Sequence, residues 1–261
     1  MIYRNLDGSD LVFEQDGKLC FDEGAHRYYI DGIGDLRSVS SIVGMFFKEF
    51  DAETISLKKC NGNVEEAARL REVWESKGSI ASQAGTFLHK QIEDYLNGKQ
   101  VPELLCNVEY KGNYVKLCET VDISREWSYF KAFERSVSFV PFRTEWRVYD
   151  VETRMAGTLD FVCACPDGTF EIFDWKRSCK IDPCEKNPWA NGINGLEHLT
   201  DTSYIHYCLQ QNLYRYMLEK NYKIRIGRMN LVVLHPELPA FKVVPIPRME
   251  REVEYITRKI V

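Results

Sequence analysis

Two aspartates and a lysine, Asp160, Asp174 and Lys176, stand close together on two segments with strand-like composition, residues 158–165 and 169–176. A proline, an aspartate and a glycine between the segments favour a tight turn. Because side chains alternate along a strand, Asp174 and Lys176 are expected to share one face. The sequence therefore predicts a hairpin that brings two carboxylates and an ammonium together at one end of a sheet.

Two neighbouring carboxylates repel each other unless a cation lies between them, and their hard oxygen atoms suit Mg²⁺ or Mn²⁺. A lysine beside them can orient or deprotonate a water, or stabilise a developing negative charge. The alternative is a surface hairpin with ordinary solvated Asp and Lys.

Two helical segments carry further polar pairs at a spacing of four residues. His89 and Glu93 form the first pair, and Gln210 and Tyr214 form the second. Residues four apart lie on the same helix face. A neutral imidazole can join carboxylates around a divalent cation, although a packed or surface histidine is the common alternative. The second pair also fits an ordinary amphipathic helix.

The order G-x-x-D at Gly157 and Asp160, then D-x-K at Asp174 and Lys176, resembles the PD-(D/E)xK nuclease superfamily. That resemblance implies a restriction-endonuclease-like α/β core, in which a mixed central sheet is flanked by helices in the order α-β-β-β-α-β. It also implies that both aspartates bind a metal ion and that Lys176 is catalytic.

Two more motifs are similar to those of the RecB-like exonuclease branch, which includes Cas4-like nucleases and mitochondrial genome-maintenance exonuclease. Gly85 and His89 match its G-x-x-x-H motif, and Gln210 and Tyr214 match its Q-x-x-x-Y motif, whereas Gln211 is offset by one. The resemblance implies that His89 is a metal ligand and that Gln210 and Tyr214 contact DNA.

The expected site is therefore larger than the hairpin. The metal ligands expected are His89, Asp160, Asp174 and the backbone carbonyl of Trp175. Arg177 and Lys180 follow the second strand and are plausible phosphate contacts. Glu93 and Glu145 are possible additions, and Glu145 could equally pair with Arg143 or Arg147.

The cysteine pattern bears on one known variant of this branch. Some relatives bind an iron–sulfur cluster through cysteines near the C-terminus. Here the last cysteine is Cys208 and no C-x-x-C pair follows it. We therefore expect Mg²⁺ or Mn²⁺ as the cofactor and no iron–sulfur cluster.

The remaining elements follow from periodicity and turn residues. We expect short strands at residues 11–14, 19–22 and 27–30. We expect helices from Ser38 or Ser40 to 47, from Asp51 to 59, from Asn63 to a break at Gly78, and at 79–96, 123–137, 202–218 and 248–260. Further strands are expected at 142–149, 224–234 and 240–246, residues 100–121 are ambiguous, and 181–199 is a long loop. This order predicts a β meander at 1–37, a helical region at 38–122 and a nuclease core at 123–261.

Composition limits the class of protein. A hydrophobic content of 44% and a charged content of 28% are ordinary for a globular protein. The net charge of −5 gives no global basic field, but residues 221–261 hold eight Lys and Arg against four Asp and Glu, which could contact phosphates. The nine cysteines, without a signal peptide or a membrane span, indicate a reduced intracellular compartment, in a cell, an organelle or the host cytoplasm of a phage or virus.

The sequence as a whole predicts a metal-dependent DNA exonuclease that acts on DNA ends, with a preference for single strands, in replication, repair or recombination. Its partners would be DNA and a recombination or replication protein, with no membrane. The alternatives are a catalytically silent nucleic-acid-binding module on the same fold, a structure-specific endonuclease, and a different two-carboxylate hydrolase such as a glycosidase.

Overall fold

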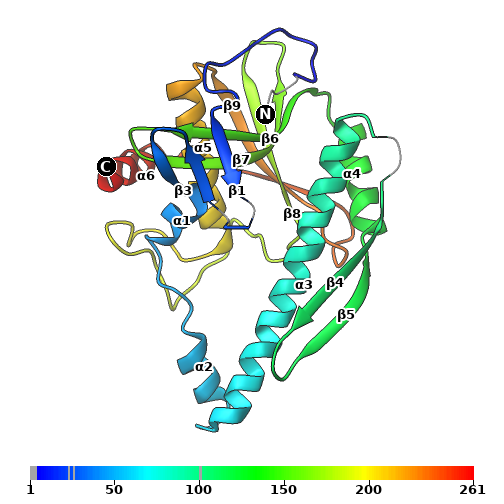
Figure 1. Ribbon diagram of the computed structural model, residues 1–261, viewed down its shortest axis with the longest axis vertical. Helices are drawn as coiled ribbons and strands as arrows, with labels where there is room; N and C mark the ends of the chain where they lie inside the picture. Colours follow the sequence, from blue (N-terminus) through cyan, green and yellow to red (C-terminus); the bar gives the residue numbers. More distant parts are fainter. Residues whose placement is uncertain (1–4, 23, 26, 100–101) are drawn as a thin grey trace. The chain divides into compact units, whose positions relative to one another are not determined.

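The computed structural model describes residues 5–22, 24–25, 27–99 and 102–261, and it is a mixed α/β fold (Figure 1). The strands are β1 (Leu19–Asp22), β2 (Arg27–Ile30), β3 (Gly34–Ser38), β4 (Leu105–Lys111), β5 (Lys116–Asp122), β6 (Val140–Asp150), β7 (Met155–Ala164), β8 (Phe170–Lys176), β9 (Ile226–Val233) and β10 (Lys242–Pro245). The helices are α1 (Val39–Gly44), α2 (Ala52–Lys59), α3 (Val64–Leu96), α4 (Ser124–Ser136), α5 (Ser203–Asn221) and α6 (Glu250–Ile260).

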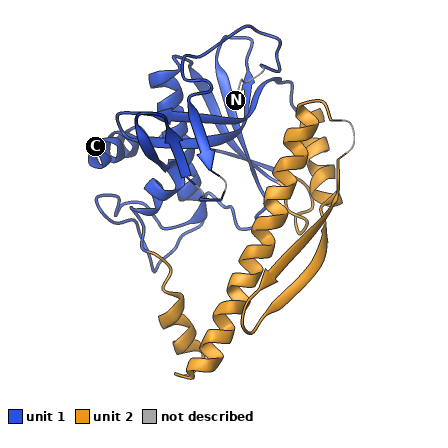
Figure 2. Cartoon of the chain, viewed as in Figure 1, with its two compact units in different colours: residues 1–48, 137–233, 242–261 blue, residues 49–136, 234–241 orange. Residues whose placement is uncertain are grey.

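The chain divides into two compact units (Figure 2). Unit 1 contains residues 1–48, 137–233 and 242–261, and unit 2 contains residues 49–136 and 234–241. This division differs from the expected one. The N-terminal strands belong with the main sheet because β3 pairs with β7, through Arg37 and Met155. Helix α4, which was expected to open the core, falls in unit 2.

The sheet of unit 1 has the strand order β1-β2-β3-β7-β8-β9-β10, and β6 pairs with β7 off this path. Strand β7 is antiparallel to both β6 and β8, whereas β8 is parallel to β9. Because β6 pairs along the whole of β7, strands β3 and β8 must share the other edge of β7. From α4 to β9 the elements follow the predicted helix, three strands, helix, strand order.

The predicted helix starts are confirmed where a side chain caps the first turn. Ser38, Asp51 and Thr202 each accept a hydrogen bond from a backbone N–H three residues later, and they begin α1, α2 and α5. Asn63 caps α3 in the same way. The expected break at Gly78 is wrong, since α3 runs unbroken through that residue. A single interior glycine costs about 1 kcal/mol, which the rest of a long helix can offset.

Two other predictions about local structure change. The ambiguous residues 100–121 include the strand β4 and most of β5, which form an antiparallel hairpin in unit 2; residues 100 and 101 lie outside the described residues. The strand expected at 11–14 is absent from the described structure. There the buried Arg143 guanidinium forms an ion pair with Asp16 at 2.8 Å, and it also donates to the carbonyl of Leu11. These two contacts of Arg143 hold the N-terminal segment in place of the expected strand pairing.

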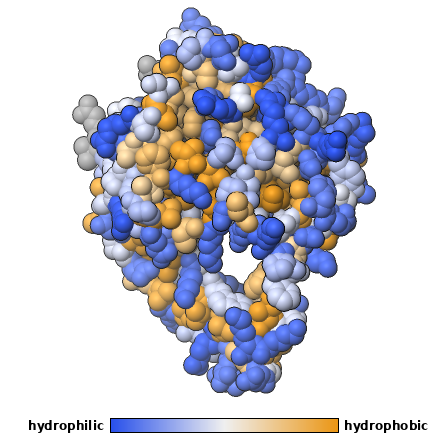
Figure 3. All heavy atoms as spheres, turned by 180° about the vertical axis from the view of Figure 1, so that it is seen from behind, coloured by the Kyte–Doolittle hydropathy of each residue, from blue (hydrophilic) through white to orange (hydrophobic). Residues whose placement is uncertain are grey.

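Aromatic rings fill much of the core of unit 1. Phe161 and Trp175 stack with ring centroids 5.7 Å apart, and Phe139 packs edge-on to Phe161 at 5.1 Å. On the surface, hydrophobic residues lie among hydrophilic ones over the face that Figure 3 shows. The longest helices are too polar for a bilayer: among the described residues, none could span a membrane.

Candidate functional site

The predicted hairpin forms, and its two strands separate at the two aspartates. The pairing of β7 with β8 extends from Ala164 and Phe170 to Phe161 and Phe173. Asp160 and Asp174 are the next residues beyond this last pair. The Asp160 carboxylate instead accepts a hydrogen bond from the backbone N–H of Trp175, at 2.9 Å. A side chain thus satisfies a strand N–H at the point where the sheet opens.

Asp174 is a buried carboxylate with two identified contacts. Its exposed fraction is 3%. Its Oδ1 accepts a hydrogen bond from Nε2 of Gln211 on α5, at 2.8 Å, and its Oδ2 forms an ion pair with Lys176. A buried charge is stable only when it is paired and hydrogen-bonded, and both conditions are met here.

Lys176 is held by two acidic groups and an aromatic ring. Its Nζ lies 4.5 Å from the centre of the Tyr207 ring. Burial lowers the pKa of Lys176, but the charges of Asp174 and Asp160 outweigh burial and raise the pKa above its ordinary range. The ammonium is therefore charged at neutral pH.

Glu145 adds a third carboxylate to this end of the sheet. The pairs on either side of it, Thr144 with Phe161 and Trp146 with Leu159, place Glu145 opposite Asp160. One of its carboxylate oxygens lies within 4.8 Å of one of Asp160. Its backbone has a φ of +45°, which is strained for a residue with a Cβ. A strained strand position that presents a carboxylate is typical of a functional site.

Arg143, one of the two arginines considered as partners for Glu145, pairs with Asp16 instead, at 2.8 Å. The other, Arg147, lies with its guanidinium 5.6 Å from the ring centre of Phe21. The pairing of Glu145 with Arg147 and its membership of the group of carboxylates both stay predictions.

The G-x-x-D and Q-x-x-x-Y motifs meet in unit 1. A Cβ added to Gly157 would lie 2.5 Å from Cε1 of Tyr214, so only glycine leaves room for the ring. The Tyr214 hydroxyl accepts a hydrogen bond from Nε2 of Gln210, at 3.1 Å. Burial raises the pKa of Tyr214 well above its usual value, and it remains a neutral phenol.

The expected residues outside this group lie on α3 and in the segment after β8. His89 and Glu93 lie on α3 in unit 2, where Glu93 forms an ion pair with Lys90 at 2.8 Å. The participation of His89 therefore stays a prediction from its motif. Arg177 and Lys180 follow β8 directly, with Arg177 half-buried and Lys180 exposed.

The oxygen-rich donor set suits a hard divalent cation. Asp160, Asp174 and Glu145 offer carboxylate oxygens at one end of the sheet, and Mg²⁺ and Mn²⁺ prefer such ligands. The structure does not assign a role to the carbonyl of Trp175, whose side chain is buried and whose N–H bonds to Asp160.

Sequence reasoning set aside Gln211 and did not consider Tyr207, although both contact the catalytic candidates. Tyr207, Gln211 and Tyr214 occur at i, i+4 and i+7 on α5, which is the spacing of one helix face. That spacing could have identified Gln211, but the motif match selected the adjacent Gln210 in its place.

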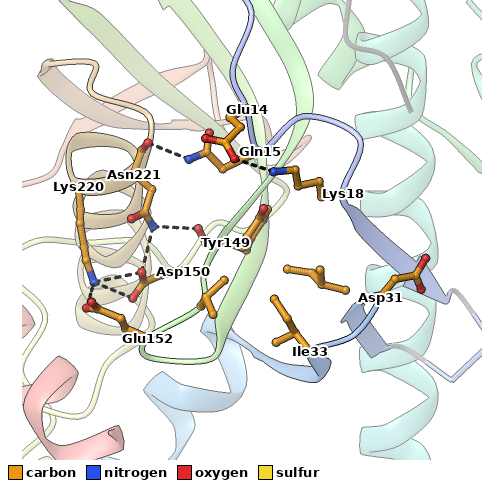
Figure 4. A pocket seen from close by; sticks show the side chains of 12 residues that line it. Glu14, Gln15, Lys18, Asp31, Ile33, Tyr149, Asp150, Glu152, Lys220 and Asn221 are labelled. Atoms are coloured by element: carbon orange, nitrogen blue, oxygen red, sulfur yellow. Dashed lines mark hydrogen bonds and ion pairs between the residues drawn. The ribbon is translucent and has the colours of Figure 1, made fainter.

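A separate hollow of about 450 Å³ in unit 1 is shown in Figure 4. Lys220 forms ion pairs with Asp150 and Glu152 there, and the Asn221 amide donates to Asp150 at 3.0 Å. Because these polar groups bond to one another, the hollow fits a structural role better than a catalytic one.

Comparisons with known proteins leave the family open. No family model and no curated protein matches the chain. A solved structure described as "Crystal structure of SSO0001" aligns over 86% of this chain and 74% of its own, at 12% sequence identity and a TM-score of 0.34. At that TM-score the likeness carries no argument about fold or function.

Proposed function

We propose that the chain is a metal-dependent nuclease of the PD-(D/E)xK type, close to the RecB-like exonucleases. Its reaction would be hydrolysis of DNA phosphodiester bonds at ends, with a preference for single strands, in replication, repair or recombination. The observation that supports this best is the point where β7 and β8 separate. There Asp160, Asp174 and Lys176 lie together, and Glu145 faces Asp160.

In this proposal Asp160, Asp174 and Glu145 hold Mg²⁺ or Mn²⁺, and His89 of unit 2 is a further ligand on the basis of its motif alone. When bound, the cation supplies Lewis acidity and charge neutralisation at the scissile phosphate. The Lys176 ammonium orients the attacking water and stabilises the negative charge that develops on the phosphate oxygens. Gln211 keeps the Asp174 carboxylate in its orientation through their hydrogen bond.

Three groups of residues would contact the substrate. The resemblance assigns Gln210 and Tyr214 to the DNA near the scissile bond. Because Tyr214 is buried against Gly157 and Gln210 is half-buried, Gln210 is the one of the two that can contact the substrate directly. Arg177 and Lys180 follow β8, where their cationic side chains would contact phosphates. The excess of Lys and Arg in residues 221–261 should contribute less to phosphate binding than its count indicates, because some of these side chains already form ion pairs. Arg228 and Arg258 form ion pairs at 2.6 Å, with Glu171 and Glu254.

The direct test is cleavage of end-labelled single- and double-stranded DNA with Mg²⁺, Mn²⁺ or EDTA. We expect cleavage only with a divalent cation, and a loss of at least about 100-fold in Lys176→Met and Asp160→Asn. His89→Ala tests in the same assay whether the predicted histidine is required. Lys186→Met, at an exposed loop position, is the matched control and should retain activity.

The same assay separates the alternatives. Binding of DNA without cleavage under every condition would support a silent binding module. Cleavage of closed circular DNA would support an endonuclease. Cleavage in EDTA, or full activity in Lys176→Met, would overturn the proposed mechanism.

A further inference from the structure

A second group of potential metal ligands lies on β7 and β8. The sulfur atoms of Cys163 and Cys165 and a carboxylate oxygen of Glu171 all lie within 4.8 Å of one another. Cys163 and Glu171 are direct partners in the antiparallel ladder. The N–H of Cys165 donates to the carbonyl of Thr169 at 2.9 Å, and this bond continues the pairing into the turn. The backbone of the hairpin thus holds the three side chains together.

This group is distinct from the candidate nuclease site. Along β8, Glu171 and Phe173 project from one face, and Asp174 and Lys176 project from the other, because side chains alternate in a strand. Gln211 of α5 contacts Asp174, so α5 covers the face opposite to Glu171. The cysteine group therefore lies across the sheet from the aspartates.

The group is partly buried and borders an open hollow. Cys163 is 1% exposed and Glu171 is 9% exposed, whereas Cys165 is half-buried. All three line a hollow of about 560 Å³ together with Arg228. Arg228 donates from Nε to Oε1 of Glu171 at 2.7 Å, and its Nη2 forms an ion pair with the same oxygen at 2.6 Å. Glu171 can therefore bind a ligand through Oε2 and keep both contacts with Arg228.

The thiols are poorly suited to act as nucleophiles. Burial, together with repulsion from the neighbouring Cys165 and Glu171, raises the pKa of Cys163 to about 12. Two sulfur donors and one carboxylate select a thiophilic divalent ion over Mg²⁺.

We propose that Cys163, Cys165 and Glu171 form a Zn²⁺ site on the face of the sheet opposite to the aspartates. Typical Zn–S distances of about 2.3 Å and Zn–O distances of about 2.0–2.2 Å require the three donors to converge by small side-chain rotations. Binding releases the two thiol protons to solvent. Three protein ligands leave the fourth tetrahedral position for a water or another donor from the hollow.

The test uses Cd²⁺ as a probe, because its bonds to thiolates absorb in the ultraviolet and its bonds to carboxylates do not. The full chain is titrated in excess Mg²⁺, which occupies oxygen-only sites. We expect saturable binding of thiolate-bound Cd²⁺, competition by Zn²⁺, and the loss of one thiolate-bound Cd²⁺ per chain, or a fall of at least about tenfold in its affinity, in Cys163→Ser/Cys165→Ser. Cys118→Ser/Cys184→Ser, which removes two exposed cysteines, is the matched control and should bind as the wild type does. Unchanged binding in the first variant, or loss in the second, would overturn the site.

A measurement on the unmodified chain covers the case in which the double variant does not fold. Iodoacetamide labelling followed by peptide mass mapping reports each thiol separately. Zn²⁺ should slow the labelling of Cys165 at least about tenfold and leave that of Cys118 and Cys184 unchanged. Equal labelling of Cys165 with and without Zn²⁺ contradicts the proposal. Neither measurement depends on DNA cleavage, so the site and the nuclease function stand or fall separately.

Discussion

Gly157 lies directly against the ring of Tyr214, so closely that a Cβ at this position would come within 2.5 Å of Cε1 and 2.8 Å of the hydroxyl. The two residues are far apart in the sequence and belong to different motifs. Their contact explains why the strand needs a glycine here: the neighbouring helix places an aromatic ring where a side chain would stand. It also fixes α5 against β7 beside Asp160.

Gly157→Ala should therefore destabilise the fold. The methyl group overlaps a buried ring, and overpacking of this kind costs about 1–3 kcal/mol. Tyr214→Leu should relieve part of that cost, so the effects of the two substitutions should be less than additive. Urea unfolding of both single variants and the double variant measures this coupling. Strict additivity would contradict the contact.

Neighbouring glutamines on α5 should have different effects. Gln211→Ala removes a donor from the buried Asp174 carboxylate, and an unsatisfied buried group costs about 1–3 kcal/mol. If the proposed function holds, cleavage should fall about tenfold or more. Gln210→Ala removes a bond to the Tyr214 hydroxyl, expected to cost about 0.5–1.5 kcal/mol, and is the control for stability alone, because Gln210 is also proposed to contact DNA. Thermal unfolding compares the two variants, and DNA cleavage is measured for Gln211→Ala against the wild type. A larger stability loss in Gln210→Ala would contradict this assignment.

The contrast between these glutamines shows how far sequence reasoning reached. A motif match identified the correct helix and the correct turn of it, because residues four apart share a helix face. It could not identify which glutamine reaches Asp174, since that depends on how α5 is rotated against the sheet. Packing sets the rotation of α5, here through the contact of Tyr214 with Gly157. The spacing of residues along the helix does not specify that packing.

The hairpin itself was predictable because turn residues and alternating strands are local signals. Its strands, β7 and β8, begin and end within a few residues of the predicted bounds. The separation of the strands at Asp160 was not predictable, since it depends on a side-chain bond to the N–H of Trp175. The long helix α3 was missed for a related reason: Gly78 is a local breaker whose cost the surrounding turns offset.

Asp150 should make stability depend on pH in the acid range. It is buried and accepts hydrogen bonds from Thr153, Asn221 and Lys220. Burial raises its pKa, but these donors outweigh burial and lower the pKa below its ordinary 3.8. A group whose pKa is lower in the folded state stabilises the fold above the unfolded-state pKa, and this stability is lost as pH falls through the folded-state pKa.

The measurement is the difference in unfolding free energy between the wild type and Asp150→Asn. It should be constant from pH 5 to 7 and shrink below about pH 3.8, where the unfolded-state carboxylate begins to gain its proton. The control is Asp31→Asn, at an exposed position in the hollow of Figure 4 that Asp150 also lines. It should change stability by less than about 0.5 kcal/mol at pH 5–7. A difference for Asp150→Asn that grows toward low pH would contradict the assigned direction.

Substitutions at Glu145 should affect the stability of the fold and the cleavage activity differently. Its φ of +45° within β6 costs about 1 kcal/mol for a residue with a Cβ, and glycine would relieve that strain. The free energy of unfolding of Glu145→Gly should therefore equal that of the wild type or exceed it by up to about 1 kcal/mol. It also removes a carboxylate that lies within 4.8 Å of Asp160, so metal-dependent cleavage should fall. Glu145→Gln keeps the strain and the shape but loses the charge, and it should lose cleavage without gaining stability. If Glu145→Gly retains full cleavage, Glu145 is not a ligand, and the strain at this position then belongs to the fold alone.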